Sequence, residues 1–221
     1  MTGVNSDTSS SRPGSRQEQA EATRALLLRT AERLYAERGL AQVSNRQIVE
    51  AAGQANNSAL TYHFGTRADV IRAIALAHAE PIGRRLRRRV EATRGSADPR
   101  EHIACLVLPH TEHLAELGVP SWYARFAAQV ATDPALDSGV RADPLLVPYV
   151  EESLAAVWAL APDLSPAEVA LRTQAARLAI IHTCAQQERV AAGTGVPADW
   201  AFVGEALTDA VTGLLLAPRL R

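Results

Sequence analysis

Lysine is absent from this sequence of 221 residues, and all 23 basic residues are arginine. Cysteine is scarce too, since Cys105 and Cys184 are the two present. Both stand in apolar helical patterns, so we expect buried thiols, with a disulfide as the weaker alternative. No apolar run approaches the roughly 18 residues of a membrane span, and the start lacks the cationic and apolar regions of a signal peptide. We therefore expect a cytoplasmic chain with no membrane partner.

Motifs for catalysis are missing as well. The sequence has no glycine-rich phosphate loop, no G-x-S-x-G elbow and no C-x-x-C pair. The stretch HTEH places His110 and His113 three residues apart, but a metal site needs three or four ligands. His102 or His182 could complete such a set, although surface or pocket-lining histidines are the simpler reading. We therefore expect that the protein is not an enzyme and that it has no catalytic residue, no metal site and no cofactor.

The charge is unevenly distributed along the chain. Residues 1–95 contain 15 arginines and 9 acidic residues, a net charge of +6, whereas residues 96–221 contain 8 arginines and 15 acidic residues, a net charge of −7. Together they give the net charge of −1. A basic N-terminal part fits contact with a polyanion such as DNA. The alternative is a chance distribution around the arginine cluster at 84–89, which we expect to form a solvated helix face.

Apolar residues recur at spacings of three and four, and alternating β-branched runs are missing, which predicts an all-α fold. The first helix is expected from Gln19 to Arg38, ended by Gly39. Pro109 is expected to kink or split the helix that begins at Pro99. The pattern S-P-x-E from Ser165 predicts the start of a long helix, and a last helix should cover 199–217.

One stretch, VSNRQIVEAAGQANNSALTYHFGTRADV, predicts two short helices on either side of Gly53. Ser44 and Gln47 have the spacing of a capping box at the start of the first of them. The second is expected over 57–64, and a further helix should open at Thr66. Two short helices joined by a glycine-containing turn are typical of a helix-turn-helix.

Polar side chains on the expected second short helix point to DNA reading. Asn, Ser and Thr bond base edges or phosphates, and Tyr and His reach phosphate oxygens. The residues concerned are Asn57, Ser58, Thr61, Tyr62 and His63. Arg46 and Arg67 can flank them as phosphate contacts, and helix starts at Ser44, Asn56 and Thr66 offer backbone N–H groups. The alternatives are packing roles for Tyr62 and His63 and a solvated Arg67.

Residues from about 22 to 82 resemble the DNA-binding domain of TetR-type transcriptional regulators. The resemblance is carried by AERLYAERGL, RQIVEAAG and SALTYHFGTRADV, and more weakly by WYARFAAQVATDPAL further on. It implies a dimeric, ligand-responsive repressor that binds a palindromic operator in double-stranded DNA and is released by a small-molecule effector. The implied and derived DNA contacts together are Ser44, Arg46, Asn56, Asn57, Ser58, Ala59, Thr61, Tyr62, His63 and Arg67.

Two departures from the family pattern affect these contacts. The turn GQANNSAL is one residue longer than the commonest form, which shifts the expected contacts at Asn56 and Asn57. Thr61 stands where the family often has an aromatic phosphate contact, a role that Tyr62 could take over.

The last two helices are apolar on more than one side, which predicts a homodimer through them. A strip of small residues, Ala206, Ala210 and Gly213, lies along the final helix. The alternative is a central core helix of a monomer.

For the effector we expect a mostly apolar pocket with a few polar groups. The candidate ligand-binding residues are His110, Trp122, Tyr123, Phe126, Tyr149, Trp158 and His182, each of which could instead be core.

The expected division is a disordered arm over 1–18, a three-helix DNA-binding domain over 19–82, and a larger helical ligand-binding and dimerisation domain over 83–221. Two alternatives stay open. The protein could be an activator or a ligand-independent regulator with the same DNA binding. It could also be an all-α small-molecule carrier or enzyme whose helix-turn-helix is only a packing corner.

Overall fold

The computed structural model describes residues 13–56, 58–141, 143–161 and 164–218. The described residues form α-helices and one 3-10 turn and contain no β-strand, which confirms the all-α prediction. The N-terminal elements are α1 (Pro13–Arg38), η1 (Leu40–Gln42), α2 (Asn45–Ala51), α3 (Ala59–Phe64) and α4 (Arg67–Thr93). The others are α5 (Pro99–Leu117), α6 (Tyr123–Val130), α7 (Pro134–Arg141), α8 (Val147–Leu160), α9 (Pro166–Thr194) and α10 (Trp200–Leu216).

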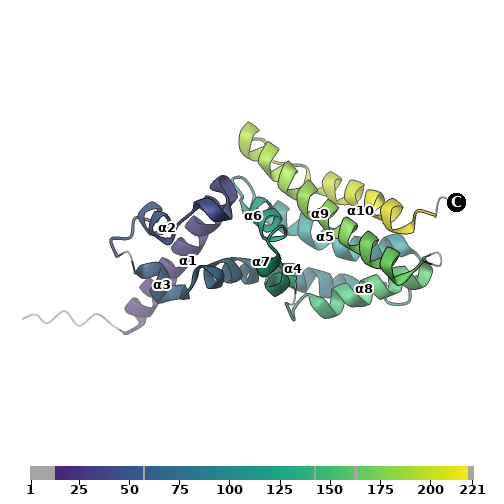
Figure 1. Ribbon diagram of the computed structural model, residues 1–221, viewed down its shortest axis with the longest axis horizontal. Helices are drawn as coiled ribbons and strands as arrows, with labels where there is room; N and C mark the ends of the chain where they lie inside the picture. Colours follow the sequence, from purple (N-terminus) through teal and green to yellow (C-terminus); the bar gives the residue numbers. More distant parts are fainter. Residues whose placement is uncertain (1–12, 57, 142, 162–163, 219–221) are drawn as a thin grey trace, which may run out of the picture.

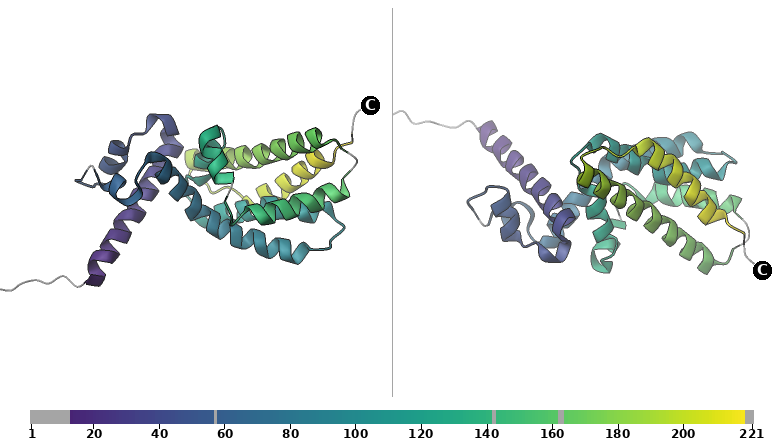
Figure 2. Two further views of the ribbon diagram at one scale, coloured as in Figure 1. Left: turned by 60° about the horizontal axis from the view of Figure 1, so that its bottom comes forward. Right: turned by 90° about the horizontal axis from the view of Figure 1, so that it is seen from above.

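The molecule is elongated, with α1, α2 and α3 at one end and α9 and α10 side by side at the other (Figures 1 and 2). Helix α4 leads from the first end into the body, where it packs against α5 and α8. One apolar core joins α1 to α4 and includes Phe126 and Val130 of α6. A second core joins α5, α6, α8, α9 and α10. Helix α6 therefore contributes to both cores.

Three helices begin with the capping boxes that the sequence predicts. In each, the hydroxyl of the cap residue accepts a hydrogen bond from the backbone N–H of the residue three positions later. The side chain of that later residue accepts a hydrogen bond from the backbone N–H of the cap residue. At α4, Asp69 N–H lies 3.2 Å from Thr66 Oγ1, and Thr66 N–H lies 2.9 Å from Asp69 Oδ2. The three pairs are Ser44–Gln47, Thr66–Asp69 and Ser165–Glu168.

Two sequence expectations about helix extent are wrong. Helix α1 begins at Pro13, six residues before Gln19, so residues 13–18 of the expected arm are helical, while residues 1–12 lie outside the described residues. Proline is tolerated in a first helical turn, and the Gln, Glu and Ala residues that follow are good helix formers. Pro109 does not split α5, which runs from Pro99 to Leu117 with Pro109 buried inside it.

The first turn of α6 is held by a carboxylate of α9. Glu188, 1% exposed, accepts the backbone N–H of Ala124 at 3.2 Å and that of Arg125 at 2.9 Å. Arg125 Nε also donates to Glu188 Oε2 at 3.1 Å. These bonds satisfy N–H groups that a helix start leaves without a partner inside the helix.

Further along α6, Gln129 bonds to the junction of α1 and η1. Its Oε1 accepts the N–H of Leu40 at 2.8 Å, and its Nε2 donates to the carbonyl of Tyr35 at 2.7 Å. The rings of Tyr35 and Phe126 also lie 6.3 Å apart, centre to centre. Helix α6 is thus bonded to α9 at its start and to the α1–η1 junction near its end.

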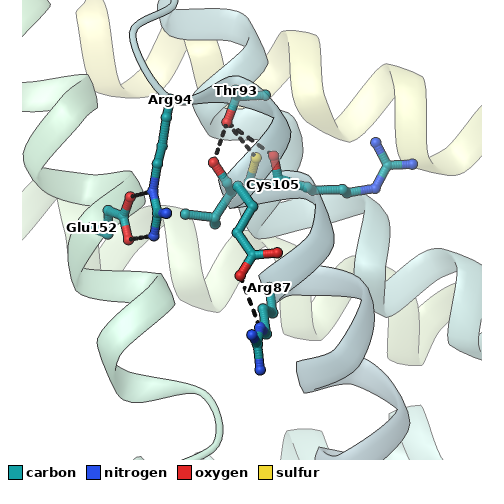
Figure 3. Close-up of polar contacts among 8 residues, drawn as sticks. Arg87, Thr93, Arg94, Cys105 and Glu152 are labelled. Atoms are coloured by element: carbon teal, nitrogen blue, oxygen red, sulfur yellow. Dashed lines mark hydrogen bonds and ion pairs between the residues drawn. The ribbon is translucent and has the colours of Figure 1, made fainter.

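The far end of α4 is fixed to the body by polar contacts (Figure 3). The Arg94 guanidinium binds both carboxylate oxygens of Glu152 on α8, at 2.6 and 3.0 Å. Thr93 Oγ1 lies 3.4 Å from Cys105 Sγ on α5.

Cys105 and Cys184 are free and buried, as predicted. Burial raises the pKa of both thiols, that of Cys184 to about 12.

The arginine cluster at 84–89 is largely paired with carboxylates. Arg84 and Arg87 bond to glutamates one turn away on α4 itself. Arg85 and Arg89 reach Glu112 of α5, and Arg85 also pairs with Glu116. These pairs connect α4 to α5.

None of the helices in the described parts of the chain combines the length and apolar character needed to cross a bilayer.

Candidate nucleic-acid interface

Helices α2 and α3 form a helix-turn-helix. Gly53, in the turn between them, has a φ of +66°, a conformation that glycine adopts without strain. Ile48 and Val49 of α2 and Leu60 of α3 are buried in the first core. The two short helices are therefore stable as part of this core, whereas neither is long enough to be stable alone.

The outer side of α3 is polar and exposed. The side chain of Tyr62 is 83% exposed, and Ser58 and Thr61 are exposed as well. His63 is half-buried, with its ring edge-on to that of Tyr62 at 5.1 Å between centres. These four residues, all predicted as DNA contacts, lie next to one another at a surface that a duplex could approach.

Three other predicted DNA contacts lie at or just before the start of α3 in the sequence, and the outcome differs for each of them. Ala59 is buried in the first core, with 8% exposed, so its side chain does not face outward and the expectation of a contact there is corrected. Asn56 Oδ1 accepts the N–H of Ser58 at 2.9 Å, which commits that oxygen to the turn. Asn57 lies outside the described residues.

Two arginines flank α3, as expected. Arg46 on α2 is exposed, and its Nε lies 2.6 Å from Glu50 Oε1, a hydrogen bond that raises the pKa of Arg46. The half-buried Arg67 guanidinium lies 5.7 Å from the centre of the Tyr35 ring. Ser44 uses its hydroxyl in the capping box of α2. The flank therefore offers two cations that are fixed by neighbours.

The candidate effector residues are not brought together. Phe126, 1% exposed, belongs to the core beside Tyr35, which is the alternative given for it from the sequence. Trp158 packs against the second core and Tyr149 against a small third core, while His182 is exposed on α9. His110 is half-buried, and burial lowers its pKa to about 4.

A buried chain of polar groups joins α1, α4 and α5. His78 Nε2 of α4 lies 3.2 Å from Glu32 Oε2 of α1, and His78 Nδ1 lies 2.8 Å from His113 Nε2 of α5. Tyr123 of α6 stacks on His78, with ring centres 3.9 Å apart. Each of the three chain members is less than a tenth exposed. Burial and the neighbouring His78 lower the pKa of His113 to about 4.

Sequence reasoning missed Glu32 and His78. A polar residue interrupting the apolar stripe of each helix was the available indication, but it does not reveal which residues meet. The HTEH stretch contributes to this chain through His113. Among the described residues, no group of three or more His, Cys, Asp or Glu side chains is arranged to hold a metal ion.

Beside this polar chain is a hollow of about 340 Å³. Its walls come from α1, from α4 and from the connection between α5 and α6. The lining residues are Leu28, Arg29, Glu32, Ile74, Ala77, His78, Leu117, Pro120, Ser121 and Trp122. Trp122 is the one effector candidate among these lining residues. The hollow thus lies where the helix-turn-helix end meets the body.

Residues 27–74 match the family described as bacterial regulatory proteins, tetR family. No curated protein matches the chain. The fold is similar to that of PfmR, a TetR family transcriptional regulator from Thermus thermophilus (19% identity, 89% of this chain and 96% of that chain, TM-score 0.55). It is also similar to the fatty acid degradation regulator FadR from Bacillus halodurans (17%, 90% and 97%, 0.55). A third similar structure is NalD, the secondary repressor of a multidrug efflux pump in Pseudomonas aeruginosa (19%, 91% and 100%, 0.54).

Proposed function

Because residues 27–74 match the tetR family of bacterial regulatory proteins, we propose that the chain is a dimeric transcriptional repressor of this family. In this proposal it binds a palindromic operator in the cytoplasm and leaves it when a small molecule binds. The observation that carries the proposal is the polar outer side of α3, held on a buried apolar core at one end of the molecule. We keep 19–82 as the DNA-binding part and 83–221 as the sensing and dimerisation part.

We propose that α3 enters the major groove. The hydroxyls of Ser58, Thr61 and Tyr62 are exposed, and hydroxyl groups bond bases or phosphates. Arg46 and Arg67 stand on either side as phosphate contacts. Of the remaining candidates, His63 keeps a proposed phosphate contact, Asn57 a proposed base contact, and Asn56 a contact through its backbone. Ser44 caps α2, and we propose that the N–H groups of the next residues, rather than its own, meet a phosphate.

We propose that the homodimer forms through α9 and α10. These helices leave large apolar side chains exposed, with Leu171 at 68% and Phe202 at 69%. Ala206, Ala210 and Gly213 are exposed on α10, where small residues permit close helix approach. Pairing with a second copy would bury both sides of each helix in a four-helix interface. It would also present two α3 helices to half-sites roughly 34–36 Å apart.

Release of the operator requires that the effector bind one arrangement of the dimer more tightly than the other, because equal affinities shift no equilibrium. Helix α6 supports such a coupling, since Gln129 bonds to the α1–η1 junction and Glu188 holds the first turn of α6. A change in the body that displaces α6 would move the helix-turn-helix end with it.

The test is fluorescence anisotropy with the purified protein and the DNA directly upstream of its own gene, against scrambled DNA, over a salt series. We expect tight binding to the upstream DNA alone, and log affinity that falls linearly with log salt concentration. If the operator lies elsewhere in the genome, a screen of genomic fragments under the same conditions would find it. Failure to select any fragment, together with an affinity independent of salt, would overturn the proposal.

A further inference from the structure

We propose that the hollow between α1, α4 and the α5–α6 connection is the effector site, and that it takes a small organic ammonium compound with an apolar or aromatic body. The inference rests on the proposed function, because it names the ligand class and location for the release step. It differs from a pocket enclosed by the helices of the body, since two of its walls belong to the helix-turn-helix end. Six of its ten lining residues lie within 19–82, so this proposal extends the sensing role beyond the part 83–221.

Glu32 supplies the reason for a cationic ligand. Its side chain is only 11% exposed, and Oε2 lies 3.2 Å from His78 Nε2. Within the described part of the chain, its other oxygen, Oε1, has no hydrogen-bond partner, so it can accept a bond from an ammonium group in the hollow. Charge-assisted bonds in a poorly solvated site are stronger than neutral ones.

The rest of the lining suits an apolar body. Leu28, Ile74 and Leu117 provide aliphatic surface, and the half-buried Trp122 provides an indole ring. An ammonium group is attracted to the face of an aromatic ring, most strongly to that of tryptophan. The volume of about 340 Å³ lies at the lower end of the range of about 300–1,000 Å³ typical of ligand sites, which favours a compact molecule.

An anionic ligand fits this lining less well. A carboxylate or phosphate would face the buried carboxylate of Glu32, and like charges repel strongly where water is excluded. Arg29, which also lines the hollow, is exposed, so solvent screens its attraction for an anion. The buried charge therefore determines the ligand class.

Binding here would couple directly to DNA affinity. An ammonium group on Oε1 would share the Glu32 carboxylate with His78, which lies at Oε2 and connects in turn to His113 on α5. Because the walls come from both ends of the molecule, a ligand that fills the hollow favours one placement of α1 and α4 relative to the body. Such a preference between two arrangements is what release requires.

The experiment uses phenethylammonium as the probe, with 2-phenylethanol as its neutral analogue and 3-phenylpropionate as its anionic analogue. Isothermal titration calorimetry measures binding to the full-length protein, and anisotropy measures release of operator DNA. We expect the ammonium probe to bind and to release DNA, and each analogue to bind at least tenfold more weakly.

Two variants locate the site. Glu32→Gln removes the charge, and Ala77→Phe fills the hollow from an exposed position on α4, which spares the core. We expect each to weaken probe binding at least tenfold. The matched controls are Glu37→Gln, an exposed glutamate on α1, and Ala92→Phe, an exposed alanine on α4 outside the hollow. Both controls should bind the probe like the wild type, and circular dichroism verifies that all four variants are folded.

Undiminished probe binding by Ala77→Phe would overturn the location, and equal binding of the neutral analogue would overturn the ligand class. Probe binding at the hollow without DNA release would overturn its role as effector site. A wild-type protein that binds no DNA even without probe would instead overturn the proposed function, and calorimetry would still decide whether the hollow binds an ammonium compound.

Discussion

Glu188 and Arg125 form a buried ion pair in which one carboxylate also holds the first turn of α6. Glu188 Oε2 accepts both the backbone N–H of Arg125, at 2.9 Å, and its Nε, at 3.1 Å. The side chains are 1% and 11% exposed, respectively. Losing one partner of such a pair leaves a buried charge without compensation, which is more costly than losing both.

Glu188→Gln should therefore lower the free energy of unfolding by about 3–5 kcal/mol, measured by urea denaturation. The double variant Glu188→Gln with Arg125→Met should recover part of this loss, because it removes both charges while the Gln oxygen can still accept a backbone N–H of α6. Glu50→Gln, which breaks an exposed pair on α2, is the control and should leave stability nearly unchanged. A Glu188→Gln protein as stable as the control would contradict the structural role of the pair.

Gln129→Ala should destabilise the contact between α6 and the helix-turn-helix end. It leaves the Leu40 N–H and the Tyr35 carbonyl without their partner, at a cost of about 1–3 kcal/mol in unfolding free energy. Thermal denaturation followed by circular dichroism measures the effect. Gln174→Ala, at an exposed position of α9, is the matched control. Equal melting temperatures for the two variants would show that these bonds contribute nothing.

Tyr62→Ala should weaken operator binding without changing stability. The side chain is 83% exposed, so truncation removes little packing, whereas loss of a DNA contact costs about 1–3 kcal/mol, roughly 5- to 150-fold in affinity. Anisotropy with operator DNA measures the loss. Val196→Ala, 64% exposed in the α9–α10 connection, serves as the control. An unchanged affinity for Tyr62→Ala would remove this residue from the interface.

Phe202→Glu should convert the proposed dimer into a monomer, because a charge would be buried within the proposed α9–α10 interface. Size-exclusion chromatography with light scattering measures the mass. Leu76→Glu changes an exposed leucine of α4, 45% exposed and remote from α9 and α10 in sequence, and should leave the mass unaltered. If Phe202→Glu keeps the wild-type mass, the interface lies elsewhere.

Acid should destabilise the protein through His113. Its pKa is about 4 in the folded chain, against 6.5 when unperturbed, so between these values the unfolded state binds more protons. The free energy of unfolding should therefore decrease as the pH falls from 7 to 5, by about 1–2 kcal/mol from this group. His113→Gln should reduce that decrease, while His182→Gln, at an exposed position, should not. Urea denaturation at each pH measures the difference.

Local chemistry could be predicted from the sequence, and long-range contacts could not. The cap residues Ser44, Thr66 and Ser165 define helix starts through bonds within three residues, so their spacing suffices. By contrast, Glu32 and His78 meet across 46 positions, and no local pattern specifies such a partner. The exposed side of α3 followed from helical periodicity, whereas the burial of Ala59 and Phe126 depends on how α3 and α6 pack against other helices.

The contribution of Phe126 and Val130 to the first core has a consequence for engineering. The proposed DNA-binding part is not portable as residues 19–82, since a transplanted segment would expose the side of Tyr35 that α6 covers. It would also lack the amide of Gln129 at the α1–η1 junction. A chimera with a foreign sensor therefore has to bring 123–130 along, or supply a helix of the same shape.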